Sequence, residues 1–216
     1  MTLLDFARGP AMQWALIIFL AGATFRLTGI LLFGRKKPLS PARGNARLEG
    51  YKTIVSRFMP NAVFHRRIGT VHIMSLAWHM GFIFVVLFFQ PHIVFFEGLL
   101  GLSWPGVANS IVMPVAGITL VLLALAFLRR INHPVLKLLS GAGDFATIIV
   151  TALPLVTGML ASAHLVLKYE TMLALHLLSI SLFLVWVPFS KLMHVVLFLP
   201  SRKRLGEKLG YKGVKA

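Results

Sequence analysis

The sequence predicts an all-α integral membrane protein with five transmembrane helices, its N-terminus outside and its C-terminus in the cytoplasm. The first observation is composition: 57% of the 216 residues are hydrophobic and 13% are charged, whereas about a quarter of the residues of a soluble domain are charged. The second is a series of five apolar stretches, each long enough to cross a bilayer. The third is the clustering of basic side chains in alternate connections, which is typical of cytoplasmic loops.

The five predicted helices form a single membrane domain over residues 1–216. Their expected ranges are about 12–33, 68–89 (starting as early as 61), 110–128, 144–166 and 171–199, with a basic cytoplasmic tail at 200–216. Gly143 and Asp144 mark the start of the fourth helix, with Asp144 as its expected N-cap. The N-terminal segment lacks a basic region and a small-residue cleavage site, so the first span is expected to remain as an anchor.

The orientation follows from the positions of the basic residues. The first and second spans are joined by a segment rich in Arg and Lys, the third and fourth by Arg129, Arg130 and Lys137, and the tail is basic throughout. By contrast, Arg8 and Lys168 lie in segments expected outside. The net charge of +16 is therefore explained by membrane topology, and nucleic-acid binding is not expected.

Two histidines in the last apolar stretch are the strongest candidates for a functional site. His176 and His194 are five turns of a continuous helix apart, on one face and separated by about 27 Å. An imidazole within a bilayer is costly and usually functional. The chain has no cysteine, which excludes iron–sulfur clusters, covalent haem and cysteine zinc sites and leaves histidine as the main candidate metal ligand. The pair predicts axial ligands to two stacked haems near opposite leaflets.

The second predicted helix offers partners for these ligands. His65, His72 and His79 repeat every seven residues and share one face, with a drift of only about 20° per step. We expect His65 to pair with His194 at an inner haem and His79 with His176 at an outer haem, because the rise of about 21 Å between His65 and His79 can be matched to 27 Å by modest tilt. His72 is the alternative to His65. The competing interpretation of the whole set is hydrogen bonding between helices.

Cationic side chains within or beside the spans could hold the haem propionates. Arg66, Arg67 and Lys191 are placed to pair with the inner haem, and Lys191 lies one turn from His194. Arg26 lies deep in the first span, where an arginine usually has a partner. Simple anchoring of Arg66 and Arg67, and snorkelling of Arg26, are the competing interpretations.

Three further histidines are expected at interfaces. His92 and His133 each adjoin a proline in a connection, and His164 ends the fourth span. A quinone pocket beside the outer haem would include His164 and Lys168, near His79. No local motif requires such a pocket.

The stretch from His176 to His194 resembles the last helix of the gamma subunit of respiratory nitrate reductase, a dihaem cytochrome b. In that family two haem-ligating histidines bracket a Pro-Phe-Ser-basic-Leu stretch, as they bracket Pro188-Phe-Ser-Lys-Leu192 here. Leu128-Arg-Arg130, Gly141-Ala-Gly-Asp144 and Phe64-His65 are also similar to the family. The second helix departs from it, because the family's ligands there are ten residues apart and the choices here are seven or fourteen. His65 versus His72, and one haem versus two, therefore stay open.

Within that superfamily, other stretches look closer to the cytochrome b subunits of sulfate-reducer transmembrane redox complexes. These are Thr151-Ala-Leu-Pro-Leu-Val-Thr-Gly-Met-Leu-Ala161, Pro188 to Phe198, and the tail from Ser201. Such complexes join a periplasmic multihaem cytochrome c to a cytoplasmic iron–sulfur subunit that resembles heterodisulfide reductase.

The resemblance implies a subunit with two haem b groups, ligated by His176 and His194 and by His65 and His79. It would pass electrons across a bacterial or archaeal cytoplasmic membrane, between a quinone pool (menaquinone in this family) or a periplasmic cytochrome c and a cytoplasmic iron–sulfur subunit. It would assemble with other membrane subunits. The alternatives are a quinol-oxidising nitrate reductase gamma subunit, a haem-free membrane anchor, and a proton-coupled transporter. The transporter is disfavoured, because only six acidic residues occur, of which Asp144 alone lies at a helix start and none lies in the middle of a span.

Overall fold

The computed structural model describes residues 1–32, 40–59 and 62–214, without the side chains of residues 62–65 and 67. Within those ranges the chain is helical and contains no strand. Five of the described helical segments are long and apolar enough to cross a membrane. The predicted class, an all-α multi-pass membrane protein, is therefore confirmed.

The membrane spans have defined bounds. The first combines α1 (Leu3–Phe6), a π-helical turn (Ala7–Ala11) and α2 (Met12–Leu32), and the second lies in α4 (Ala62–Phe88). The third is α6 (Asn109–Asn132), the fourth is α8 (Ala142–Ser162), and the fifth begins as α9 (Tyr169–Trp186). The remaining α-helices lie between or after the spans: α3 (Ala46–Ser56), α5 (Gln90–Leu100), α7 (Pro134–Leu139) and α10 (His194–Tyr211).

The expectation of one continuous helix over 171–199 is wrong. After α9 the chain forms two short 3-10 turns, Val187–Phe189 and Lys191–Met193, with Ser190 in extended conformation between them. Pro188 has no backbone N–H to continue the helical ladder, and the Ser190 hydroxyl accepts from the Leu192 amide at 3.2 Å. His194 therefore opens a separate helix, and its spacing from His176 no longer places the two residues on one face.

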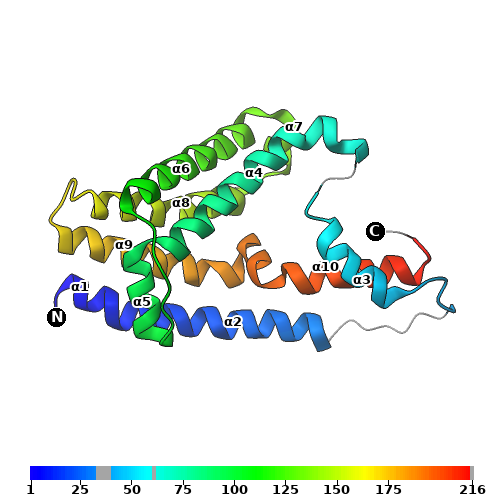
Figure 1. Ribbon diagram of the computed structural model, residues 1–216, viewed down its shortest axis with the longest axis horizontal. Coiled ribbons are helices and arrows are strands. Elements are labelled where there is room, and N and C mark those ends of the chain that lie inside the picture. Colours follow the sequence, from blue (N-terminus) through cyan, green and yellow to red (C-terminus); the bar gives the residue numbers. More distant parts are fainter. Residues whose placement is uncertain (33–39, 60–61, 215–216) are drawn as a thin grey trace. The chain divides into compact units, whose positions relative to one another are not determined.

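The stretch predicted as a basic tail, 200–216, is helical as far as residue 211, because it belongs to α10, which packs along α3 (Figure 1). A Cβ at Gly206 would collide with the Thr53 side chain and the Glu49 carbonyl, so the missing side chain permits the close approach. Arg202 Nη1 donates to the Ile54 carbonyl at 3.1 Å, and its guanidinium lies 4.6 Å from the centre of the Phe58 ring. These contacts hold the two cationic segments together.

The chain divides into two compact units. The first unit comprises residues 1–13 and 69–183, and the second unit comprises residues 14–68 and 184–216. In the first unit, α4, α6 and α8 run side by side (Figure 1) around the buried residues Val85, Val112, Ala116, Leu123 and Leu155. In the second unit, a Cβ at Gly22 of α2 would lie 2.5 Å from the Pro188 Cβ, so this glycine admits the proline that interrupts the last span.

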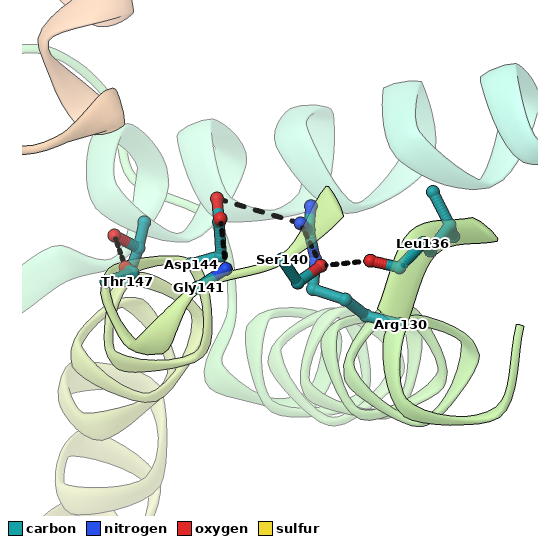
Figure 2. Close-up of polar contacts among 7 residues, drawn as sticks. Arg130, Leu136, Ser140, Gly141, Asp144 and Thr147 are labelled. Atoms are coloured by element: carbon teal, nitrogen blue, oxygen red, sulfur yellow. Dashed lines mark hydrogen bonds and ion pairs between the residues drawn. The ribbon is translucent and has the colours of Figure 1, made fainter. Parts of the chain in front are cut away.

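A polar network closes the turn from α6 through α7 to α8 (Figure 2). Arg130 donates to the Ser140 hydroxyl at 2.9 Å and lies 3.6 Å from the Asp144 carboxylate. Asp144 also accepts from the Gly141 amide at 3.1 Å, so it is the third residue of α8 and Gly141 is the N-cap. The expected N-cap is therefore wrong by three residues, because the carboxylate reaches back to the cap from within the first turn.

Candidate functional site

The sequence-predicted residues separate between the two units of the chain. The first unit holds His72, His79, His164, Lys168 and His176. The second unit holds His65, His194, Arg26, Arg66, Arg67 and Lys191. Each predicted pair of haem ligands, His79 with His176 and His65 with His194, thus falls within one unit.

His176 lies two turns into α9, on the face that meets α8. A Cβ at Gly158 would lie 2.9 Å from Cε1 and 3.2 Å from Nδ1 of the His176 ring. The imidazole therefore lies directly against the α8 backbone, in space that any larger residue at position 158 would fill. The half-buried ring is thereby fixed in position from one side.

A chain of hydroxyl groups fixes the orientation of the His176 ring. Its Nδ1 is 3.2 Å from Thr157 Oγ1, and that oxygen lies 2.8 Å from the Leu153 carbonyl. The Leu153 contact is the shorter one and a carbonyl only accepts, so we assign the Thr157 hydroxyl proton to Leu153 and the His176 Nδ1–H as the donor to Thr157. Ser179 lies 3.0 Å from Thr157 and donates to the His176 carbonyl at 2.7 Å. With Nδ1 protonated, Nε2 of the neutral ring carries the lone pair.

His92 lies beside His176, a proximity that no spacing in the sequence predicts. The two ring centres are 6.1 Å apart and the ring planes are inclined by only 13°. His92 Nδ1 is 3.1 Å from the Val85 carbonyl, to which it donates. Burial lowers the pKa of His92, and its hydrogen bonds with the Val85 and Val86 carbonyls partly oppose this effect. The ring is therefore neutral at pH 7, with its lone pair on Nε2.

His72 and His79 lie on the continuous helix α4, as expected, and both are half-buried. His79 Nδ1 lies 2.6 Å from the Ser75 carbonyl one turn earlier, so it too is the donor nitrogen. The His79 ring stacks on Trp78 with ring centres 3.6 Å apart. Both histidines keep the common face predicted from their spacing.

The structure describes some residues of the predicted inner site. His194 is exposed at the start of α10, and its Nδ1 lies 2.8 Å from the Lys191 carbonyl. Arg26, Arg66 and Lys191 have exposed side chains. The side chains of His65 and Arg67 lie outside the described residues.

The predicted quinone residues lie in the connection between α8 and α9. His164 has left-handed backbone (φ 54°), as does Val166 (φ 75°), a conformation that is unusual for residues other than glycine. The His164 ring stacks on Tyr169 with ring centres 5.0 Å apart, and Lys168 is exposed.

A haem places fewer demands on the protein than a metal ion bound by side chains alone, because the porphyrin occupies four positions and two axial ligands complete the iron. In the described ranges, no group of three or more His, Asp or Glu side chains is arranged to hold a metal ion. His92 and His176 supply two imidazoles, the number that the axial positions of one haem require. Each has its Nδ1 held by an acceptor, the outer-shell contact usual for a metal-bound histidine.

His176 is predicted from the sequence, whereas its surroundings are not. Thr157 and Ser179 look like ordinary small polar residues of apolar helices, and Gly158 is equally consistent with helix packing. One signal is present: Thr157-Gly158 lies in the stretch similar to the cytochrome b family. Nothing in the spacing of His92 relates it to His176, because their proximity depends on the turn between α4 and α5.

Comparison with known proteins gives a partial relative. The chain is 36% identical over 129 residues to a protein of Nitratidesulfovibrio vulgaris that is described only as "Protein". The match covers 60% of this chain and 57% of the relative, so the chain spans little more than half of the length of the curated relative it matches. No family model and no solved structure match the chain.

Proposed function

We propose that this protein is a b-type dihaem cytochrome subunit of a respiratory membrane complex and moves electrons across the membrane. The observation that carries the proposal is the placement of His176. A histidine in an apolar span, seated against a glycine and held at Nδ1 by a hydroxyl, presents Nε2 as an iron ligand. Two axial imidazoles would fill both open positions of a haem iron, which suits electron transfer and leaves no position for oxygen.

The direction of the chain in the membrane follows from its basic connections. The N-terminus lies outside and the C-terminus in the cytoplasm of a bacterial or archaeal cell. His176 then belongs to the haem near the outer surface and His194 to the haem near the cytoplasm, with His65, His72 or His79 as partners from α4. Arg26, Arg66, Arg67 and Lys191 are the candidate partners of the propionates.

The partners follow from the resemblance and from charge. Electrons enter or leave at the outer haem by way of a quinone, with menaquinone the expected kind, or by way of a periplasmic multihaem cytochrome c. His164 and Lys168 are the candidate quinone residues. At the cytoplasmic side, α3 and α10 present Arg and Lys side chains that would attract an acidic iron–sulfur subunit. Other membrane subunits complete the complex.

The competing assignment is a haem-free membrane anchor whose histidines are structural. His176 has such a structural contact, since its ring closes a hydrogen-bonded link between α8 and α9. The two assignments differ in one optical property, because an anchor has no Soret absorption.

The test is a dithionite-reduced minus oxidised spectrum of the purified full-length protein and of a His176→Ala variant. We expect b-type haem bands in the wild type. In the variant, we expect the part of this absorption that belongs to one of the two haems to be lost. Well-folded wild-type protein with no haem absorption would overturn the proposal and leave the anchor assignment. A quinol-oxidising nitrate reductase gamma subunit would show the same haem bands but co-purify with a nitrate-reducing subunit.

A further inference from the structure

His92 lies at the start of α5, outside the membrane spans, and the pattern of apolar spans does not explain its position beside His176. It lies four residues after the end of α4, where a solvent or lipid contact would be its ordinary role. Instead its ring is half-buried and nearly parallel to that of His176, with 6.1 Å between ring centres and 13° between planes. Both residues belong to the first unit of the chain.

The turn from α4 to α5 is built to hold His92 there. Phe89 is extended (ψ 122°) between the two helices, and Pro91 stands in the first turn of α5, where a missing N–H has no cost. Ile93, the next residue, is completely buried. The Phe89 ring meets the His92 ring edge-on at 5.2 Å. Because the backbone is fixed before His92 by Pro91 and after it by Ile93, the imidazole has little freedom to turn away from His176.

The segment after α5 returns to the end of α4 and secures the same turn. The Trp104 indole donates to the Leu87 carbonyl at 2.6 Å, and the Val107 amide donates to the Phe88 carbonyl at 2.9 Å. Gly106 leaves room for Gln90 and Ile93, because a Cβ at that position would collide with the Gln90 side chain and lie only 3.2 Å from Cδ1 of Ile93. Thus α5 is fastened to the end of α4 before α6 begins.

Both rings carry their proton on Nδ1, which leaves Nε2 available to bind a metal between them. Each Nδ1 donates to an acceptor, the Val85 carbonyl for His92 and the Thr157 hydroxyl for His176. A neutral imidazole that is protonated at Nδ1 carries its lone pair on Nε2, the atom that binds a metal. The half-buried rings of His92 and His176 are therefore both in the tautomer that offers Nε2 to iron.

The spacing of the rings agrees with a shared iron. Two imidazoles bound on opposite sides of one metal, with each metal–nitrogen bond about 2 Å, have ring centres about 6 Å apart. Rings in face-to-face contact would be closer, as Trp78 and His79 are at 3.6 Å. The 6.1 Å between His92 and His176 is longer than this face-to-face contact and agrees with two rings on one iron, and it also lies within the range of offset aromatic pairs.

We infer that His92 and His176 are the two axial ligands of the outer haem, so that α5 supplies the second imidazole in place of His79 of α4. This inference rests on the proposed function. His79 is then no longer required at the outer haem.

The experiment compares purified full-length wild type with His92→Ala, His176→Ala and His79→Ala. Haem per polypeptide and the low-temperature EPR spectrum of the oxidised protein are measured for each. We expect His92→Ala and His176→Ala to lose the same low-spin ferric signal. We expect His79→Ala to keep that signal. Nearly parallel axial rings also predict that the shared signal is rhombic.

A variant with a different iron-binding side chain tests the inference even if the alanine variants fail to fold. His92→Met keeps a side chain that can bind iron, and replacing one imidazole by a thioether raises the potential of a haem. We expect this variant to keep its haem content while one haem becomes more easily reduced. Unchanged potentials with both low-spin signals intact would show that His92 is not a ligand.

The outcomes separate the inference from the proposed function. Wild-type protein without haem would overturn both. Wild-type protein with haem, whose low-spin signals all persist in His92→Ala, would overturn the inference alone and make the ring pair an ordinary aromatic contact. Loss of the His176 signal in His79→Ala, with His92→Ala unaffected, would restore the pairing expected from sequence.

Discussion

The position of the His176 imidazole depends on the absence of a side chain at Gly158. We expect Gly158→Ala to push the ring from its place, because the new Cβ would lie 2.9 Å from Cε1. Overpacking of this kind costs about 1–3 kcal/mol, which corresponds to roughly a tenfold to hundredfold weaker hold on the haem. Haem retention during purification measures the effect. The matched control is Gly117→Ala on α6, where a Cβ would make an ordinary 3.7 Å contact with Met159; equal haem loss in both variants would contradict this role of Gly158.

If His176 ligates a haem as proposed, Thr157 is its positioning residue, since it lies 3.2 Å from Nδ1 and leaves Nε2 for the iron. We expect Thr157→Val to keep the haem but raise the midpoint potential of one haem, because a ligand without its outer-shell acceptor is less basic and stabilises ferric iron less well. The shift should be on the order of tens of millivolts, since a tenfold change corresponds to about 59 mV for one electron. Redox titration measures it. Thr157→Ser should restore the wild-type potential, and a potential unaffected by Thr157→Val would refute the positioning role.

At the scale of single residues, the sequence singles out His176 on α9 as a candidate ligand but does not predict its surroundings. His176 is recognisable because an imidazole in the middle of an apolar stretch needs a reason. The contacts of Gly158 and Thr157 with it depend on the rotation of α8 against α9, which no spacing rule gives. The proximity of His92 depends on the Phe89–Pro91 turn, and from sequence His92 is expected only as an interface residue.

The pairing of α3 with α10 depends on small residues where the helices approach. We expect Gly206→Leu to separate them, because even a Cβ there collides with Thr53 and the Glu49 carbonyl. The overpacking at position 206 should cost about 1–3 kcal/mol. Amide hydrogen exchange in α3 and in the C-terminal half of α10 should therefore become roughly tenfold faster or more. Ser201→Leu, at an exposed position of the same helix, should leave exchange unchanged. Slow exchange retained in Gly206→Leu would mean that the pair is held by other contacts.

The elements show what hydropathy predicts and what it does not. The apolar spans can be located because length and composition alone decide whether a helix can cross a bilayer. The fifth helix ends earlier than hydropathy predicts, and Pro188 is the signal in the sequence for the interruption that the structure contains. The part of α10 beyond residue 199 is not predicted as a helix, because its Arg and Lys residues are interpreted only as topology signals. Gly206 and Gly210, one turn apart, also indicate a packed face.

The orientation of the whole molecule in the membrane is a prediction. It can be tested by labelling single introduced cysteines, because the chain has no native cysteine. Leu138, in α7, and Leu165, between α8 and α9, are 87% and 54% exposed, and each can be replaced by a single cysteine. In intact cells we expect a membrane-impermeant maleimide to label Leu165→Cys, and to label Leu138→Cys only after permeabilisation, because the basic connections stay in the cytoplasm. The reverse pattern would invert the topology and exchange the inner and outer sites.

The central claim is that this chain carries haem between histidines of its own helices. The most direct measurement is pyridine haemochrome quantitation of haem b per polypeptide in the purified, folded wild-type protein. We predict two haems per chain. A folded chain that contains no haem would contradict the claim and would leave a membrane anchor whose histidines only tie helices together.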